Sequence, residues 1–185
     1  MRAFGLVLSV AGLMSLGTQP TGAAVQYPLT LTLDGQVKLG VTTVTSKLTI
    51  KVDRPMEESR RTRVTDALKF GGYPNFLKTL RPLPAVGSIA TQTKTVDVKY
   101  TREEQDGTTT RLILVGDRPL FFLSPDPEKA KAGYELTLVD LRFDGKGGVT
   151  GQMAGAARVK PAPDGSVILD TYAEDPVPLK GQVGK

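Results

Sequence analysis

Apolar and polar residues alternate along much of this chain with the period of two that is typical of β-strands. In residues 29–33, leucines occupy every second position and threonines lie between them. A similar alternation recurs in residues 95–100. Successive side chains of a strand point to opposite faces of its sheet, so these segments predict strands with one buried face. Residues 112–115 are apolar on both faces and predict a central strand covered from both sides.

Asp-Gly dipeptides lie between the segments of this pattern. They stand at Asp34-Gly35, Asp106-Gly107, Asp144-Gly145 and Asp164-Gly165. Asp-Gly favours the positive φ angles of a type I′ turn, whose twist matches that of the strands it joins. We therefore expect each dipeptide to close a hairpin. The last two share a strand, so residues 134–171 predict a three-stranded antiparallel meander.

Two further segments refine the β pattern. The middle strand of the meander contains Gly151 and Gly155, and glycines within a strand mark a bend, a bulge or close packing. We favour that structural role over a ligand approaching the bare backbone, and it is what a strongly curved sheet needs. Residues 119–123 predict a short strand that begins at Pro119, where the missing N–H costs least.

Residues 54–81 interrupt the β pattern with the spacing of two short helices. Asp53 is expected to cap the first helix and Gly71-Gly72 to end it, whereas Pro74 is expected to begin the second. The apolar positions with helical spacing are Met56, Val64, Ala67 and Leu68, followed by Phe76, Leu77 and Leu80. The sequence thus predicts a mainly β fold, an antiparallel barrel or sandwich of about 8–10 strands with a two-helix insert. The glycines of the meander favour the barrel.

The first 24 residues have the pattern of a secretory signal peptide. Arg2 gives a basic start, an apolar run of 14 residues follows, and Gly22-Ala23-Ala24 offers small residues to a signal peptidase. The run is shorter than the about 20 residues of a membrane-spanning helix, although a retained anchor is the alternative. We expect cleavage after Ala24, a single domain over residues 25–185, no transmembrane segment in the mature chain, and a periplasmic or secreted location.

The amino-acid composition excludes whole classes of chemistry. The 185 residues include no His and no Cys. Without imidazole or thiolate groups, Ser-His-Asp and Cys-His catalysis are impossible, and disulfides and thiolate metal sites are excluded as well. We assign no catalytic residue, no metal site and no cofactor.

The surplus of positive charge is concentrated in the predicted insert. The whole chain has 24 basic and 19 acidic residues, a net charge of +5. Residues 54–81 contain seven of the basic and three of the acidic residues, and the rest of the mature chain is balanced. This distribution predicts a docking face for an anionic partner. Its candidate residues are Arg60, Arg61, Arg63, Lys69, Lys78 and Arg81. The alternative is an ordinary solvated helix face whose arginine stems cover apolar surface.

The resulting expectation is an exported, non-enzymatic β-domain that binds an anionic protein, a lipid headgroup or a glycan through the insert. Nucleic acid is a poor fit to an exported protein. One alternative is a barrel that carries an apolar small molecule or lipid, with the insert as its lid. The other is a carboxylate-dependent glycan hydrolase, which needs two acids across a cleft.

Asp140 is the acid of most interest for the hydrolase alternative. It shares a strand face with Leu136 and Leu138, so we expect it to point inward with them. A buried carboxylate must be paired or protonated. Arg111, Arg142 and Arg158 are the conceivable partners. A structural ion pair is the interpretation we favour over catalysis.

Overall fold

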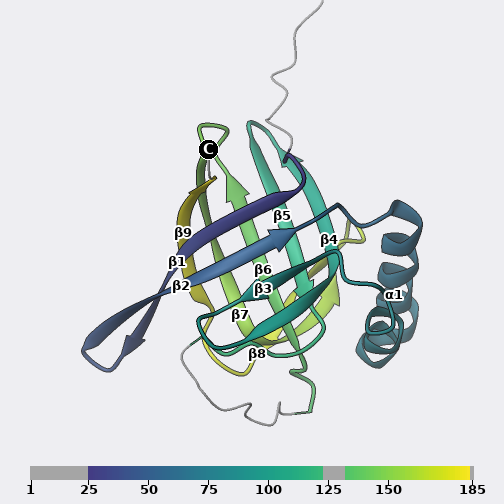
Figure 1. The fold of residues 1–185 in the computed structure, drawn as a ribbon. Helices are drawn as coiled ribbons and strands as arrows, with labels where there is room; N and C mark the ends of the chain where they lie inside the picture. The colour runs from purple at the N-terminus through teal and green to yellow at the C-terminus, as the bar shows by residue number, and fades with distance from the viewer. Residues whose placement is uncertain (1–24, 123–131, 184–185) are drawn as a thin grey trace, which may run out of the picture.

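A computed structural model describes residues 25–122 and 132–183 of the chain (Figure 1). The predicted signal peptide and Leu123 lie outside these residues. Nine antiparallel strands are described. They are β1 (Leu29–Leu39), β2 (Thr42–Val52), β3 (Gly87–Ala90), β4 (Thr95–Asp106), β5 (Thr109–Gly116), β6 (Leu136–Phe143), β7 (Gly148–Pro161), β8 (Val167–Tyr172) and β9 (Val177–Val183).

Eight of these strands close into a barrel. Each strand from β1 to β6 pairs with the strand that follows it in the chain. Strand β7 pairs with β9, and β9 pairs with β1, which closes the ring. Strand β8 stays outside this ring and pairs with the last part of β7. The mainly β prediction is confirmed, and the barrel rather than the sandwich is the observed form. The predicted meander is present as β6, β7 and β8.

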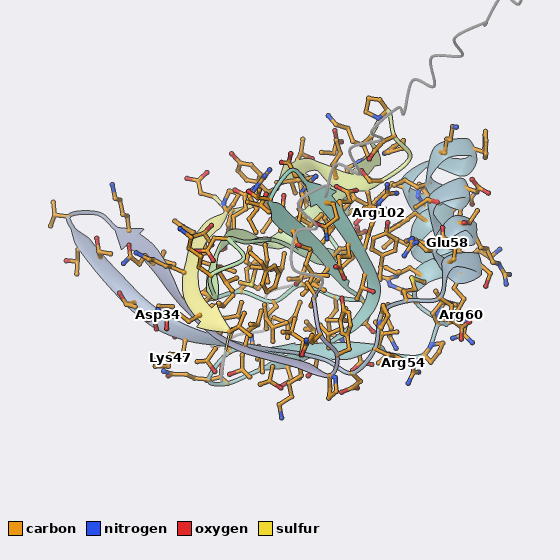
Figure 2. All side chains as sticks on the ribbon, turned by 90° about the horizontal axis from the view of Figure 1, so that it is seen from above. Asp34, Lys47, Arg54, Glu58, Arg60 and Arg102 are labelled. Carbon is orange, nitrogen blue, oxygen red and sulfur yellow. The ribbon has the colours of Figure 1, made fainter. Side chains whose placement is uncertain are left out.

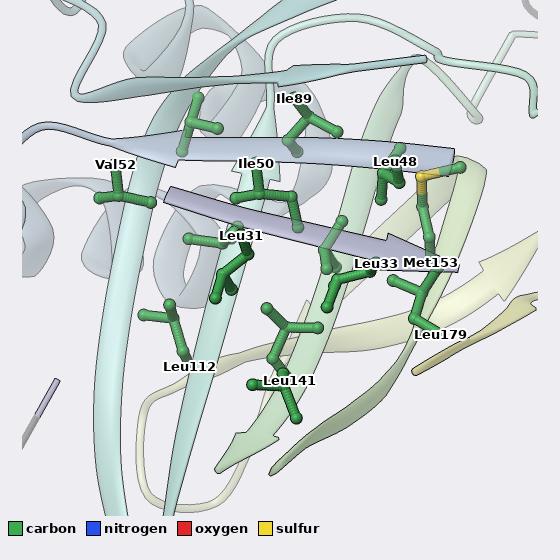
Figure 3. Close-up of a cluster of buried hydrophobic side chains, with 14 of the residues drawn as sticks. Leu31, Leu33, Leu48, Ile50, Val52, Ile89, Leu112, Leu141, Met153 and Leu179 are labelled. Carbon is green, nitrogen blue, oxygen red and sulfur yellow. The ribbon is translucent and has the colours of Figure 1, made fainter. Parts of the chain in front are cut away.

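Side chains fill the inside of the barrel. Leu31 and Leu33 of β1 face Leu48 and Ile50 of β2, and all four are fully buried (Figure 3). A barrel of eight strands is just wide enough to be filled in this way. The alternation predicted from residues 29–33 is therefore the alternation between the inside and the outside of the barrel.

The helical element of the described residues, α1 (Glu58–Leu80), covers part of the outer surface beside β4 (Figure 1). Its buried stripe packs against side chains that point outward from the barrel, among them Ile113, Val115 and Leu138. Strand β5 is consequently buried on both faces, as residues 112–115 predicted. Apolar surface is therefore removed from water on both sides of the barrel wall, inside the barrel and beneath α1.

The predicted break within the helical insert is confirmed. Gly72 has a left-handed φ of 69° that interrupts α1, and Pro74 follows at the beginning of the second helical part. The start of the insert differs from its prediction. The helix begins at Glu58 and its N-cap is Glu57, so the Asp53 cap was wrong. The reason is that the Asp53 N–H already donates to the Val86 carbonyl at 2.9 Å, which keeps the chain extended beyond β2.

Three of the four Asp-Gly turns are confirmed. Gly107, Gly145 and Gly165 each have a positive φ in the connections β4–β5, β6–β7 and β7–β8. The prediction for Asp34-Gly35 was wrong, because both residues lie in the middle of β1. The chain turns instead at residues 40–41, between β1 and β2. Gly35 meets a packing need: a Cβ there would lie 2.2 Å from the ring of Phe122.

Close packing also explains Gly155. A Cβ at this position would lie 2.3 Å from the carbonyl oxygen of Leu120, and the Leu120 N–H donates to the Gly155 carbonyl at 2.8 Å. The structural role expected for this glycine is confirmed. The strand predicted to begin at Pro119 is wrong for the described residues 119–122, which adopt no strand. Leu120 and Phe122 instead fill the barrel interior, and this burial explains their apolar character.

In the described part of the chain, no helix combines the length and the apolar character needed to cross a bilayer.

Candidate functional site

The candidate docking face lies on α1, outside the barrel. Helix α1 turns Val64, Leu68, Phe76 and Leu80 toward the barrel wall, where they are buried. The remaining sides of the helix are left for solvent. One stripe of apolar side chains thus supplies the packing of α1 against the barrel, and the exposed residues of α1 are not needed for this packing.

Two of the six predicted docking residues are engaged within the helix itself. The Arg60 Nε lies 3.1 Å from a Glu57 carboxylate oxygen, and Arg61 pairs with Glu58. The Arg61 side chain is also only 23% exposed. Both pairs join residues three positions apart, which is the usual reach of helix-surface ion pairs. These two arginines therefore present less free charge than the sequence suggested.

The other four are exposed: Arg63, Lys69, Lys78 and Arg81. Arg63, Lys69 and Lys78 form no ion pair with an acid among the described residues. Arg54, just before the helix, is exposed as well, and Figure 2 shows it at the same end of the molecule as Arg60, away from the Asp34–Lys47 pair.

Phe70 is the residue of this surface that the sequence analysis missed. Its side chain is 77% exposed, and the Lys69 ammonium lies 5.3 Å from the centre of its ring. Helical spacing was the available signal: Phe70 follows Val64 by six residues, which turns it by roughly 120° from the buried stripe. Single exposed apolar side chains are common on protein surfaces, so Phe70 is of interest because a cation lies beside its ring.

The six predicted residues do not share one face. Arg63 and Phe70 are seven residues apart and point in nearly the same direction, whereas Lys69 lies roughly 120° away from Arg63 around the helix. Lys78 and Arg81 come after the kink at Gly72. The basic groups therefore surround the exposed part of α1 rather than forming a single stripe.

Asp140 takes part in a structural ion pair, as expected. Its two carboxylate oxygens accept hydrogen bonds from Arg111 Nε at 2.9 Å and Nη2 at 2.7 Å. Asp140 does share a strand face with Leu136 and Leu138, but that face is the outer one, toward α1, and not the barrel interior. This part of the prediction was wrong, because the burial of that face comes from the helix. Hydrogen bonds to Asp140 raise the pKa of Arg111 above its usual value.

The pair belongs to a longer chain of charges across β4, β5 and β6. Arg111 also contacts Glu104 at 3.2 Å, Glu104 contacts Arg102 at 2.7 Å, and Arg102 contacts Asp164 at 3.4 Å. Each of these acids is paired with at least one arginine along the outer side of the strands, whereas glycoside hydrolysis needs two carboxyl groups that face each other across a cleft. The geometry of this network therefore lends the hydrolase alternative no support.

The interior of the barrel bears on the carrier alternative. A carrier would need a chamber, but the interior side chains pack against one another and are at most 9% exposed. A hollow of about 270 Å³ opens at one end of the barrel, lined by Val25, Gln26, Leu29, Phe143, Gly145, Gly147 and Val183. Ligand sites usually measure about 300–1,000 Å³, so this hollow is small for a lipid.

Comparison with known proteins found no matching family model, no matching curated protein and no matching solved structure.

Proposed function

We propose that this protein is an exported, non-enzymatic β-barrel that binds an anionic lipid surface of the cell envelope through α1. One observation carries the proposal: Phe70 is 77% exposed with the Lys69 ammonium 5.3 Å from its ring, on a helix whose apolar stripe is already buried against the barrel. The fold therefore gives no reason for Phe70 to be exposed, whereas a membrane interface would.

The combination of groups favours lipid over a glycan or an acidic protein. Aromatic rings settle at the boundary between headgroups and acyl chains, and lysine and arginine side chains beside them reach the phosphates. Each basic residue near an anionic membrane contributes about 1 kcal/mol of attraction. A sulfated or carboxylated glycan would use the same basic groups and could stack only the face of a sugar ring on Phe70, whereas a bilayer interface would receive the whole ring.

The charge distribution would also orient the barrel. Residues 54–81 carry a net charge of +4, and the mature chain outside them has equal numbers of basic and acidic residues. A negative surface would attract the α1 side of the molecule and leave the opposite side facing away. Such attraction weakens in salt, because mobile ions screen exposed charges.

Charge reversal on α1 tests the proposal. The triple variant Arg63→Glu/Lys69→Glu/Lys78→Glu should lose about 100-fold or more in affinity, since each reversal replaces an attraction with a repulsion. The measurement is co-sedimentation with phosphatidylcholine vesicles, with and without phosphatidylglycerol. Phe70→Ser, which leaves the charge unchanged, should weaken binding to the same vesicles.

The matched control places the same change of charge elsewhere. Lys38→Glu/Lys146→Glu/Lys180→Glu reverses three exposed lysines on β1, the β6–β7 connection and β9, away from α1, and should keep most of the binding. Equal losses in both triple variants would contradict a specific docking face. Binding that ignores phosphatidylglycerol, or that occurs only on an acidic glycan, would overturn the lipid assignment.

A further inference from the structure

Glu103 is an acidic residue on the interior face of the barrel wall. It lies opposite Leu112 in the β4–β5 ladder, and Leu112 is part of the buried interior. Residues directly opposite one another in an antiparallel pair project to the same face, so Glu103 points inward at one mouth of the barrel. A carboxylate in such a position loses part of its hydration and needs compensation.

Its two partners come from the segment before β1. The Val25 backbone nitrogen donates to Glu103 Oε1 at 3.1 Å, and the Tyr27 hydroxyl donates to Oε2 at 3.4 Å. No lysine or arginine among the described residues forms an ion pair with Glu103. Its neighbour Glu104, which points outward, contacts both Arg102 and Arg111. Within the described residues, the inward acid of this adjacent pair therefore has hydrogen-bond donors but no cation.

Val25 is also the residue that directly follows the predicted cleavage site. A signal peptidase would hydrolyse the Ala24–Val25 peptide bond with one water, so that Ala24 leaves with a carboxylate and Val25 keeps an amine. An α-amino group has an ordinary pKa of about 7.7–8.0 and is mostly protonated at neutral pH. The atom that donates to Glu103 would become a cation.

We propose that removal of the signal peptide supplies a cation for Glu103: the N-terminal ammonium group of mature Val25 forms an ion pair with the Glu103 carboxylate and fixes the start of the chain to β4. The proposal rests on the export part of the proposed function. Val25 and Tyr27 already pack against the barrel interior, so the ammonium group would be held in place by its own neighbours. Charge-assisted hydrogen bonds are roughly twice as strong as neutral ones.

The pair makes stability depend on pH in a defined direction. The Glu103 carboxylate raises the pKa of the Val25 ammonium group in the folded protein relative to the unfolded chain. Its contribution is then complete below the ordinary pKa and is lost as the pH rises through the folded value. Burial and Glu103 raise the pKa of Tyr27, so its phenol stays neutral over this range. The other residues that line the hollow beside Val25 have no titratable side chain.

The pKa of the Val25 amine tests the pair directly. Protein that begins at Val25 is prepared as wild type, as Glu103→Gln and as the matched control Glu104→Gln, and the amine is titrated by NMR. The pKa should lie above the ordinary value in the wild type, return to it in Glu103→Gln and stay high in Glu104→Gln. The same pKa in the wild type and in Glu103→Gln would overturn the proposal.

A second measurement needs no mutation in the barrel. Acetylation of Val25 removes the positive charge and should lower the melting temperature by roughly 3 °C in the wild type but hardly at all in Glu103→Gln. Equal losses in the two proteins would contradict the pair. Mass spectrometry of the exported chain is a separate check, because an N-terminus other than Val25 overturns the processing step but leaves vesicle binding through α1 intact.

Discussion

Gly35 and Phe122 illustrate how one missing side chain shapes the barrel. An Asp-Gly dipeptide usually marks a turn because glycine tolerates positive φ. Gly35 has no such backbone role, and its value lies in the space that it leaves for the Phe122 ring inside the barrel. No property of residues 34–35 alone distinguishes the two uses, because the ring comes from a segment far along the sequence.

This contact yields a prediction at the scale of single residues. Gly35→Ala should lower the free energy of unfolding by about 2 kcal/mol, because the new methyl group overlaps the buried ring of Phe122. Phe122→Leu, which removes part of the ring, should make the same alanine substitution much less costly. Urea unfolding of the two single variants and the double variant measures this coupling. Strictly additive losses would show that Gly35 does not make room for the Phe122 ring. As a control, Gln36→Ala at an exposed neighbouring position should be nearly neutral.

At the scale of elements, the β1–β2 hairpin extends beyond the barrel (Figure 1). Strand β1 pairs with β9 only up to Gly35, and β2 pairs with β3 only from Thr49. Beyond Gly35, the next positions opposite β1 include Pro178 of β9 and Pro176 just before β9, which have no N–H with which to continue the ladder. The outer part of the hairpin is thus a two-stranded ribbon, and such ribbons are marginally stable in water.

Hydrogen exchange should reveal the difference between ribbon and barrel. Amides in residues 36–47 should exchange much faster than those of residues 112–115 in β5, because the ribbon opens without disturbing the packed interior. Mass spectrometry of peptides from the two regions makes the comparison. Equal protection in both regions would mean that something covers the ribbon in solution.

The elements differ in how far the sequence predicts them. Residues 29–33 and 112–115 and three of the Asp-Gly turns were predictable, because each depends on local periodicity or local backbone preference. The extension of β1 through Gly35, the start of α1 at Glu58 and the absence of a strand in residues 119–122 were not. Each of these depends on a partner distant in sequence: Phe122, Val86 and the barrel interior, respectively.

At the scale of the whole molecule, the candidate surface was predictable in composition but not in geometry. The excess of basic residues in residues 54–81 can be counted directly. The ion pairs of Arg60 and Arg61 follow from local helical spacing, whereas the exposure of Arg63, Lys69 and Lys78 depends on where the barrel meets the helix. That meeting surface also explains Asp140, whose strand face is covered by α1 rather than enclosed by the barrel.

The buried contact between α1 and the barrel wall predicts that the helix and the barrel unfold together. Leu68 of α1 belongs to one buried cluster with Tyr100 and Ile113 of the barrel wall, and burial raises the pKa of Tyr100 to about 12. Leu68→Ala should lower the free energy of unfolding by about 3 kcal/mol, through lost contacts and the cavity that remains. Because the cluster joins both elements, far-UV circular dichroism and tyrosine fluorescence should shift to the same lower urea midpoint. Loss of the helical signal at a lower urea concentration than the tyrosine signal would show that α1 unfolds independently of the barrel. As a control, Val41→Ala at the exposed hairpin turn should move neither midpoint.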